Sequence, residues 1–111
     1  MKTYKEARPW GDFIRYTQNE VSTVKIITVK ANEQLSLQFH HKRSEFWRIL
    51  TDGGEVIVDG KATPGKKDAE YFIPAGMTHQ VKGPMQFLEI SLGDFDEGDI
   101  VRLEDKYNRI G

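Results

Sequence analysis

The stretch LSLQFHHKRSEFW, residues 35–47, decides the fold class of this chain. Its first six residues alternate strictly between apolar and polar, which is typical of a strand with two different faces. A short polar connection then leads into SEFWRIL, residues 44–50, which is rich in side chains that strands favour. The stretch predicts two β-strands joined by a tight turn. The apolar face of the first strand consists of Leu35, Leu37 and Phe39, and its polar face of Ser36, Gln38 and His40.

Similar short runs, separated by turn residues, extend from about residue 21 to residue 92. VSTVKIITV at residues 21–29 is β-branched almost throughout, Asp59-Gly60 is a strong hairpin signal, and residues 63–68 have the composition of a polar loop. Helical periodicity is nearly absent, so the spacing predicts an all-β sandwich or barrel with a short N-terminal arm. The charged tail, residues 94–111, fits either a short helix or a strand along the barrel edge.

Length and composition limit the classes of protein. A chain of 111 residues with 38% apolar residues is expected to form one domain, residues 1–111, around one core. Sixteen Lys and Arg against 17 Asp and Glu give a formal net charge of -1, which argues against nucleic acid or an anionic membrane as a partner. Without cysteine, metal ligands must be oxygen or imidazole groups. No signal peptide or span of ~20 apolar residues is visible, so we expect a soluble, cytoplasmic protein.

Four polar side chains form a pattern that suits a metal ion. Gln38 and His40 lie two residues apart, so their side chains leave the strand on the same side, although solvent exposure alone explains that face equally well. Glu45 begins an apolar strand, where a carboxylate needs a partner. His79 follows a rigid turn at residues 74–78 that can aim its imidazole. Together they predict a divalent metal site, with zinc favoured and manganese, iron, nickel or cobalt also suited.

The same residues carry a family resemblance. Gln38-x-His40 with Glu45, and the later Pro74-x-Gly76-x-x-His79, resemble the two motifs of the cupin superfamily. ARPWGDF, LSLQFHHKRSEFW, YFIPAGMTH and DIVRLEDKYNR are similar to the C-terminal isomerase domain of type II phosphomannose isomerases, the bifunctional mannose-1-phosphate guanylyltransferases. The resemblance implies a cupin-type double-stranded β-helix, or jelly-roll, barrel. It also implies the metal ligands Gln38, His40, Glu45 and His79, a catalytic or substrate-binding role for Arg43, and a place near the site for Arg109.

The chain departs from the family pattern at three places. Phe46 stands where the family usually has His, Lys82-Gly83-Pro84 where it has Asn, and Asn108 where it has Gly. None of these changes removes a ligand, but Phe46 can alter a contact beside the metal and leaves the substrate open. No Gly-rich phosphate-binding loop replaces the nucleotidyltransferase half, so we expect no sugar-nucleotide synthesis from these residues.

The resemblance also implies an activity, the interconversion of mannose 6-phosphate and fructose 6-phosphate through an enediolate. A metal would polarise the oxygens at C1 and C2 while a nearby group moves a proton between the carbons. The candidates for that group are His41 and Lys42, beside the ligand His40, and Glu89 on the last predicted strand, residues 86–92. A surface position suits His41 at least as well. Arg43 is the first candidate for the phosphate because its guanidinium is a planar fork. Lys42, Arg48, Arg102 and Arg109 are further candidates for binding the phosphorylated substrate.

Two other functions fit the same barrel. One is a non-catalytic cupin that binds a sugar or sugar phosphate. The other is a different carbohydrate-modifying enzyme, such as an epimerase, because one fold hosts many chemistries.

The apolar face of residues 35–39 bears on the oligomeric state. If the ligands point into the barrel, Leu35, Leu37 and Phe39 point outward and must be covered. We therefore expect a homodimer.

Overall fold

The fold is built from β-strands alone over residues 2–107, the part of the chain that this computed structural model describes. Strands occur in each of the runs predicted between residues 21 and 92, and further ones lie outside them. The described strands are β1 (Tyr4–Arg8), β2 (Gly11–Arg15), β3 (Ser22–Val29), β4 (Leu37–Phe39), β5 (Ser44–Ile49), β6 (Glu55–Val58), β7 (Lys61–Pro64), β8 (Glu70–Ile73), β9 (His79–Lys82), β10 (Met85–Leu92) and β11 (Val101–Glu104).

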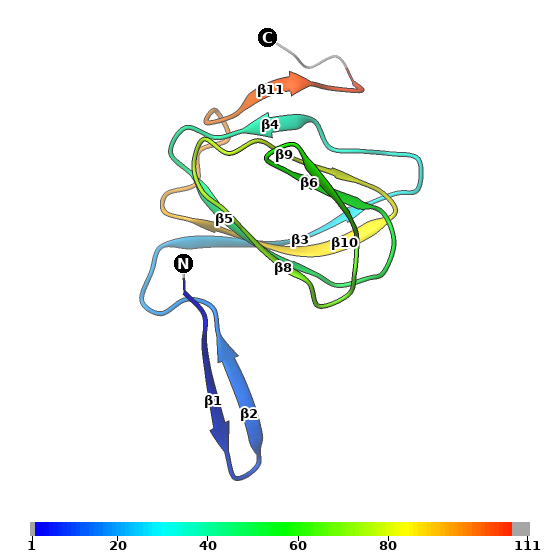
Figure 1. Cartoon of the computed structure of the whole chain (residues 1–111). Helices are drawn as coiled ribbons and strands as arrows, with labels where there is room; N and C mark the ends of the chain where they lie inside the picture. Colours follow the sequence, from blue (N-terminus) through cyan, green and yellow to red (C-terminus); the bar gives the residue numbers. More distant parts are fainter. Residues whose placement is uncertain (1, 108–111) are drawn as a thin grey trace.

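Two antiparallel sheets face each other and form the barrel (Figure 1). One sheet has four strands in the order β3-β10-β5-β8, and the other has five in the order β11-β4-β9-β6-β7. Strands far apart in the sequence are neighbours in both sheets, for example β3 with β10 and β4 with β9. This arrangement is typical of a jelly roll, and it confirms the predicted all-β barrel.

Large apolar side chains fill one part of the space between the sheets. Trp47, Ile49 and Phe87 from the four-stranded sheet meet Val56 and Val81 from the five-stranded sheet, and each is no more than 1% exposed. The rings of Trp47 and Phe87 lie 4.9 Å apart between centroids. Burying each such side chain contributes about 1.5–3 kcal/mol, so this cluster holds the two sheets together.

Two local predictions need correction, and one open alternative is decided. The strand expected over residues 35–40 is regular only at residues 37–39, because Leu35 turns inward to pack against the core instead of sharing an outer face. The loop expected at residues 63–68 begins two residues later, since Thr63 and Pro64 belong to β7, an edge strand where proline is tolerated. For the tail, described as far as residue 107, the predicted alternative of a strand along the barrel edge is confirmed by β11.

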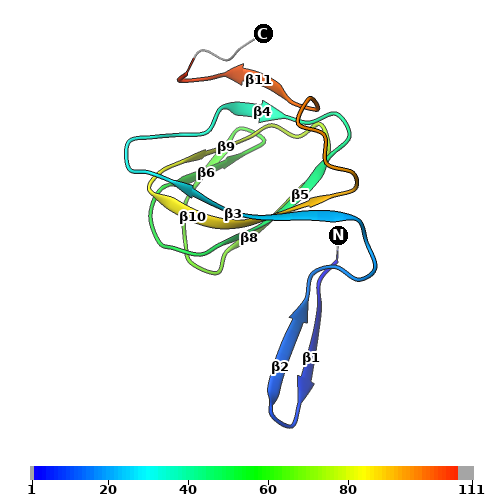
Figure 2. The ribbon, with the colours of Figure 1, turned by 180° about the vertical axis from the view of Figure 1, so that it is seen from behind.

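An N-terminal hairpin, β1 paired with β2, projects away from the barrel in both views (Figures 1 and 2). Within residues 2–107 these two strands belong to neither barrel sheet. Trp10, at the turn between them, is 74% exposed. The sequence predicted only a short arm there, because residues 4–15 lack the strict alternation of a half-buried strand.

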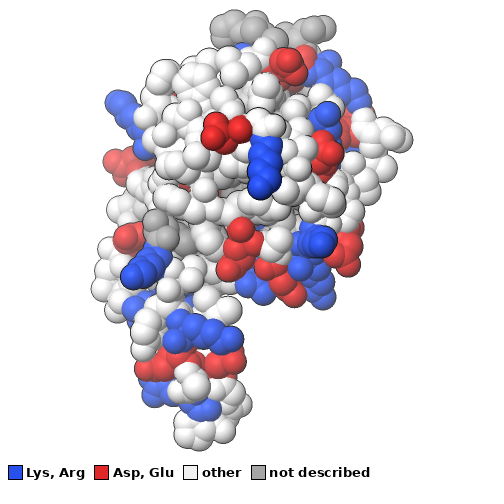
Figure 3. Space-filling model, viewed as in Figure 1, with Lys and Arg blue, Asp and Glu red and all other residues white. Residues whose placement is uncertain are grey.

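The surface carries no large field of one sign on the face shown in Figure 3. Lys and Arg alternate there with Asp and Glu, as the net charge of -1 predicts. Among residues 2–107 there is no helix long and apolar enough to cross a membrane.

Candidate metal centre

Strand pairing brings the four predicted ligand residues together between the sheets. Gln38 on β4 lies directly opposite His79 on β9. Glu45 lies on β5 of the other sheet, and His40 follows the end of β4. His40, Glu45 and His79 are at most 2% exposed, and one ligand atom from each lies within 4.8 Å of the others. These three residues form a cluster that could hold a metal ion.

The turn before His79 is tied to the strand end that carries His40. The backbone N–H of Gly76 donates to the carbonyl of His40 at 2.7 Å. Gly76 has a φ of 86°, a left-handed conformation that costs glycine little. The rigid turn predicted from proline and glycine therefore fixes both imidazoles relative to each other.

Both imidazoles present the same nitrogen to the centre of the cluster. His40 Nδ1 donates to the carbonyl of Asp99 at 2.5 Å, and His79 Nδ1 donates to the carbonyl of Met77 at 3.0 Å. Each Nε2 therefore carries a lone pair directed at the cluster, which is the arrangement found in histidine metal ligands. Burial lowers the pKa of His79, which favours the neutral imidazole that a metal requires.

Glu45 supplies a negative charge between the two rings. Its Oε2 lies 3.2 Å from His40 Nε2, and its Oε1 lies 3.8 Å from His79 Nε2. Burial acts to raise the pKa of Glu45, but contacts with His40, His79 and Arg43 outweigh it and hold the pKa at about 2. The indole N–H of Trp47 also donates to Oε1 at 3.0 Å. A carboxylate and two imidazole lone pairs so placed suit a divalent cation.

The Gln38 amide completes this side of the cluster. Its Nε2 donates to His79 Nε2 at 3.4 Å, while its Oε1 accepts from the Ser36 hydroxyl at 2.8 Å. A half turn of the amide would direct Oε1 at the cluster, and the Ser36 hydroxyl can accept as well as donate. Gln38 is thus placed to serve as an oxygen ligand.

Arg43 closes the cluster on its other side. Its Nε donates to Glu45 Oε2 at 3.0 Å, and its Nη2 donates to His40 Nε2 at 2.9 Å. The side chain is only 10% exposed. Arg43 therefore touches two of the candidate ligands directly, which fits the role that the resemblance gave it at the site.

Asp99 is a positioning residue that the sequence did not reveal. Its carboxylate accepts the backbone N–H groups of His41, Lys42 and Arg43 at 2.7–3.1 Å, while its carbonyl orients His40. Burial acts to raise the pKa of Asp99, but those three N–H groups lower it. These three hydrogen bonds form a clamp on residues 41–43. Because they lower the pKa of Asp99 in the folded protein, the clamp stabilises the fold at pH values above the ordinary pKa of aspartate. This stabilisation is lost as the pH falls through the lowered pKa of Asp99.

Two further predicted site residues, His41 and Lys42, are not brought to the cluster. The ring of His41 is exposed and packs edge-on against Phe39 at 5.3 Å, and the side chain of Lys42 is exposed. Arg109 lies outside the described residues. His41 therefore lies at the surface, the position that suited its sequence context at least as well as a role in moving a proton.

Glu89 is a second buried acid on the inner face of the barrel. Glu89 lies on β10, opposite Trp47 of β5, and is 7% exposed. Its carboxyl group accepts a hydrogen bond from the Ser91 hydroxyl at 3.0 Å. Burial raises the pKa of Glu89, and the charge of Glu45 raises it further. Glu89 and Glu45 therefore have pKa values shifted in opposite directions within one site. The alternation in the last predicted strand was the one sequence signal that Glu89 faces inward.

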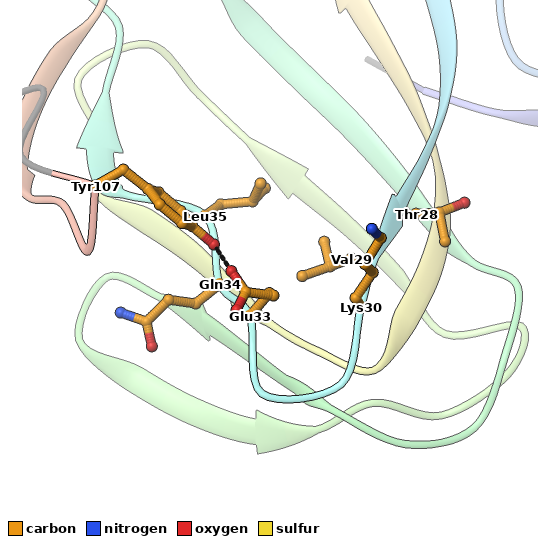
Figure 4. A pocket seen from close by; sticks show the side chains of 7 residues that line it. All are labelled: Thr28, Val29, Lys30, Glu33, Gln34, Leu35 and Tyr107. Atoms are coloured by element: carbon orange, nitrogen blue, oxygen red, sulfur yellow. Dashed lines mark hydrogen bonds between the residues drawn. The ribbon is translucent and has the colours of Figure 1, made fainter.

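A separate hollow of about 440 Å³ lies where β3 ends and β4 begins, whereas the cluster lies where β4 ends (Figure 4). Its carboxylate, Glu33, is already held by the Lys106 ammonium at 3.0 Å and by the Tyr107 hydroxyl. The predicted metal ligands lie in the cluster and not in this hollow, so we place the functional site at the cluster.

The fold and the cluster define a cupin. Solved cupin-type structures share the architecture at identities too low to show more than the fold. A variant of Streptomyces PAC13 with uridine has a TM-score of 0.68 and 18% identity over 84% of this chain and 78% of its own. A cupin protein from Bacteroides fragilis has a TM-score of 0.59 and 21% identity over 68% of this chain and 70% of its own.

A particular family can also be assigned. Residues 1–105 match the family described as mannose-6-phosphate isomerase C-terminal, and the chain belongs to this family. The mannose-1-phosphate guanylyltransferase ManC of Salmonella typhimurium is 35% identical over 93% of this chain and 22% of its own length. The xanthan biosynthesis protein XanB of Xanthomonas campestris is 36% identical over 95% of this chain and 24% of its own length.

These relatives correct the predicted activity. Although the family description contains the word isomerase, similar proteins such as those from Salmonella typhimurium and Escherichia coli are named mannose-1-phosphate guanylyltransferases. Guanylyl transfer is a nucleotidyl transfer rather than an isomerisation, so the predicted interconversion of mannose 6-phosphate and fructose 6-phosphate is overturned. The chain spans less than a quarter of the length of these two relatives.

Asp99→Ala tests whether the clamp positions His40. We expect metal affinity to fall by about 10–100-fold, because the carboxylate that fixes the carbonyl accepting from His40 is lost. Isothermal titration with Zn²⁺ measures the effect, with Asp94→Ala, an exposed aspartate of the same segment, as the control. Equal zinc affinity in Asp99→Ala and the wild-type protein would show that the clamp does not orient His40.

Proposed function

We propose that the chain, residues 1–111, is one cupin domain that binds zinc at His40, Glu45, His79 and Gln38, and a phosphorylated sugar beside it. The observation that carries the proposal is the common orientation of the two imidazoles, whose Nδ1 atoms donate to carbonyls while both Nε2 atoms face the Glu45 carboxylate. Two imidazoles and one glutamate are a ligand set known for zinc sites that keep a further position for a ligand.

The surrounding residues divide the work of such a site. Bound zinc would act as a Lewis acid toward a hydroxyl or carbonyl oxygen of the sugar. Arg43 touches the ligand Glu45 and also lines a surface hollow beside the cluster, so it can hold the anionic part of the sugar close to the ligands. Glu89, a buried acid whose pKa is raised by burial, can form a hydrogen bond with a ligand within the barrel.

The relatives favour a mannose derivative as the sugar. Their names specify mannose 1-phosphate as the compound on which they act. Because the chain spans only 22–23% of those two proteins, we propose binding of this compound by the domain and not the activity of the whole relatives.

Calorimetric titration of the zinc-loaded protein with mannose 1-phosphate tests the proposal. We expect saturable binding that weakens by about tenfold or more after chelation, since removal of the cation takes away one contact to the sugar. His79→Ala, which removes one ligand, should bind mannose 1-phosphate as weakly as the chelated protein. Binding that is equally tight with and without zinc would contradict the proposal, as would the lack of any binding.

We further propose a homodimer, supported by uncovered apolar surface at two places. Val24, Ile26 and Phe72, on the outer face of the four-stranded sheet, are 58%, 62% and 43% exposed. The projecting hairpin exposes Trp10, and an isolated two-stranded hairpin is at best marginally stable in water. A second copy that packs its hairpin against this sheet would cover both surfaces at once. Leu35, which packs against the core, no longer supports the face first expected to form the interface.

The double variant Val24→Glu/Ile26→Glu tests this interface. We expect the wild-type protein to sediment as a dimer and the variant as a monomer, because association would bury two carboxylates without partners. Ala62→Glu, an exposed position on β7, is the control and should remain dimeric. A monomeric wild-type protein at all concentrations measured by ultracentrifugation would contradict the homodimer.

A further inference from the structure

A second hollow, beside the metal cluster, is lined mainly by cations. It has a volume of about 340 Å³ and is lined by Lys25, Arg43, Phe95, Glu97, Ile100 and Arg102. Three of these side chains are positive and one is negative, whereas the chain as a whole has 16 Lys and Arg against 17 Asp and Glu. This local excess of positive charge distinguishes the hollow from the mixed surface seen in Figure 3.

Strand register places the cations beside the cluster. Arg102 on β11 lies opposite Gln38 on β4, so the two side chains leave the sheet on the same face. Lys25 on β3 lies opposite Glu89 on β10 and shares the inner face of the other sheet. Arg43 belongs to both places, because it contacts Glu45 and also lines the hollow.

Phe95 holds two of the cations in place. The Lys25 Nζ lies 4.1 Å from the centroid of its ring, and the Arg43 Cζ lies 4.7 Å from it. Such contacts favour a cation over the ring face without neutralising its charge. Lys25 therefore remains available to an anion, while Arg43 can offer only the donors that Glu45 and His40 leave free.

Arg102 has an unused donor at this hollow. Its Nε is buried and has no hydrogen-bond partner among residues 2–107. A buried donor without a partner is costly, so native structures seldom retain one without a ligand or water to satisfy it. Among the described residues, neither Lys25 nor Arg102 forms a salt bridge, while Arg43 is paired with Glu45.

We infer that this hollow is a subsite for the dianionic phosphate group of a phosphate monoester, with Lys25 and Arg102 as its principal contacts and Arg43 between the phosphate and the metal cluster. Guanidinium groups suit phosphate because their parallel N–H donors match its oxygens. The inference deepens the proposed function and rests on it for the sugar, since a phosphate here would leave the sugar beside the cluster.

The test measures the binding of three probes to chelator-treated protein: inorganic phosphate, mannose and mannose 1-phosphate. Chelation ensures that phosphate does not bind to a metal. We expect Arg102→Gln and Lys25→Gln each to weaken the binding of phosphate and of mannose 1-phosphate by about tenfold, and to leave the binding of mannose unchanged. Lys61→Gln, an exposed lysine on β7, is the control and should bind all three probes as the wild-type protein does.

Amide chemical shifts give a second readout that does not depend on the variants. Phosphate should shift the resonances of residues 25, 43, 95 and 102 in the wild-type protein. Shifts confined to other residues, or variants that bind phosphate as tightly as the wild-type protein, would overturn the subsite.

Failure of the proposed function would look different. Phosphate bound through Lys25 and Arg102, with no gain in affinity from the mannosyl group in the zinc-loaded protein, supports the subsite and contradicts the proposed sugar. Zinc-dependent binding of mannose 1-phosphate that both variants retain contradicts the subsite alone.

Discussion

A buried carboxylate between two imidazole lone pairs is the constraint on which the site depends. Glu45 is 2% exposed and ionised, and removal of a carboxylate from water costs several kcal/mol unless a cation compensates it. Contacts with His40, His79 and Arg43 keep the pKa of Glu45 low, and both imidazoles turn Nε2 lone pairs toward it because their Nδ1 atoms donate to carbonyls. Arg43 supplies one positive charge, and a divalent metal would supply the rest. Asp99 and Met77 act on the site by fixing the imidazoles.

Much of the fold and the candidate ligands could be predicted because they depend on local patterns. Alternation in residues 35–40 placed Gln38 and His40 on one face, and the turn before His79 was visible in its proline and glycine. Asp99 could not be predicted, because it contacts His40 across 59 residues through a loop without periodicity. The projecting hairpin was missed because its two strands belong to neither barrel sheet. They therefore need no apolar face, and the sequence shows no alternation there. The inward turn of Leu35 depends on its backbone bond to Val81, which no local pattern shows.

Function was less accessible than fold for a physical reason. The same barrel and the same four metal ligands are compatible with several chemistries, because the residues around the ligands and the bound small molecule decide between them. Here the residues around the ligands include the buried Glu89, the Arg43 shared between two sites, and the cationic hollow at Arg102. The isomerase prediction is overturned because the relatives are named for guanylyl transfer. The metal and the phosphorylated sugar stay proposals, and the geometry of the site supports them.

Anomalous diffraction from crystals of the zinc-loaded protein, collected on both sides of the zinc absorption edge, tests the central claim most directly. The account predicts one strong anomalous peak about 2.0–2.1 Å from the Nε2 atoms of His40 and His79, with a Glu45 oxygen at a similar distance. Arg43 would no longer donate to His40 Nε2 in that crystal. Zinc bound only elsewhere, or no zinc at all with Arg43 still on His40, would contradict the account.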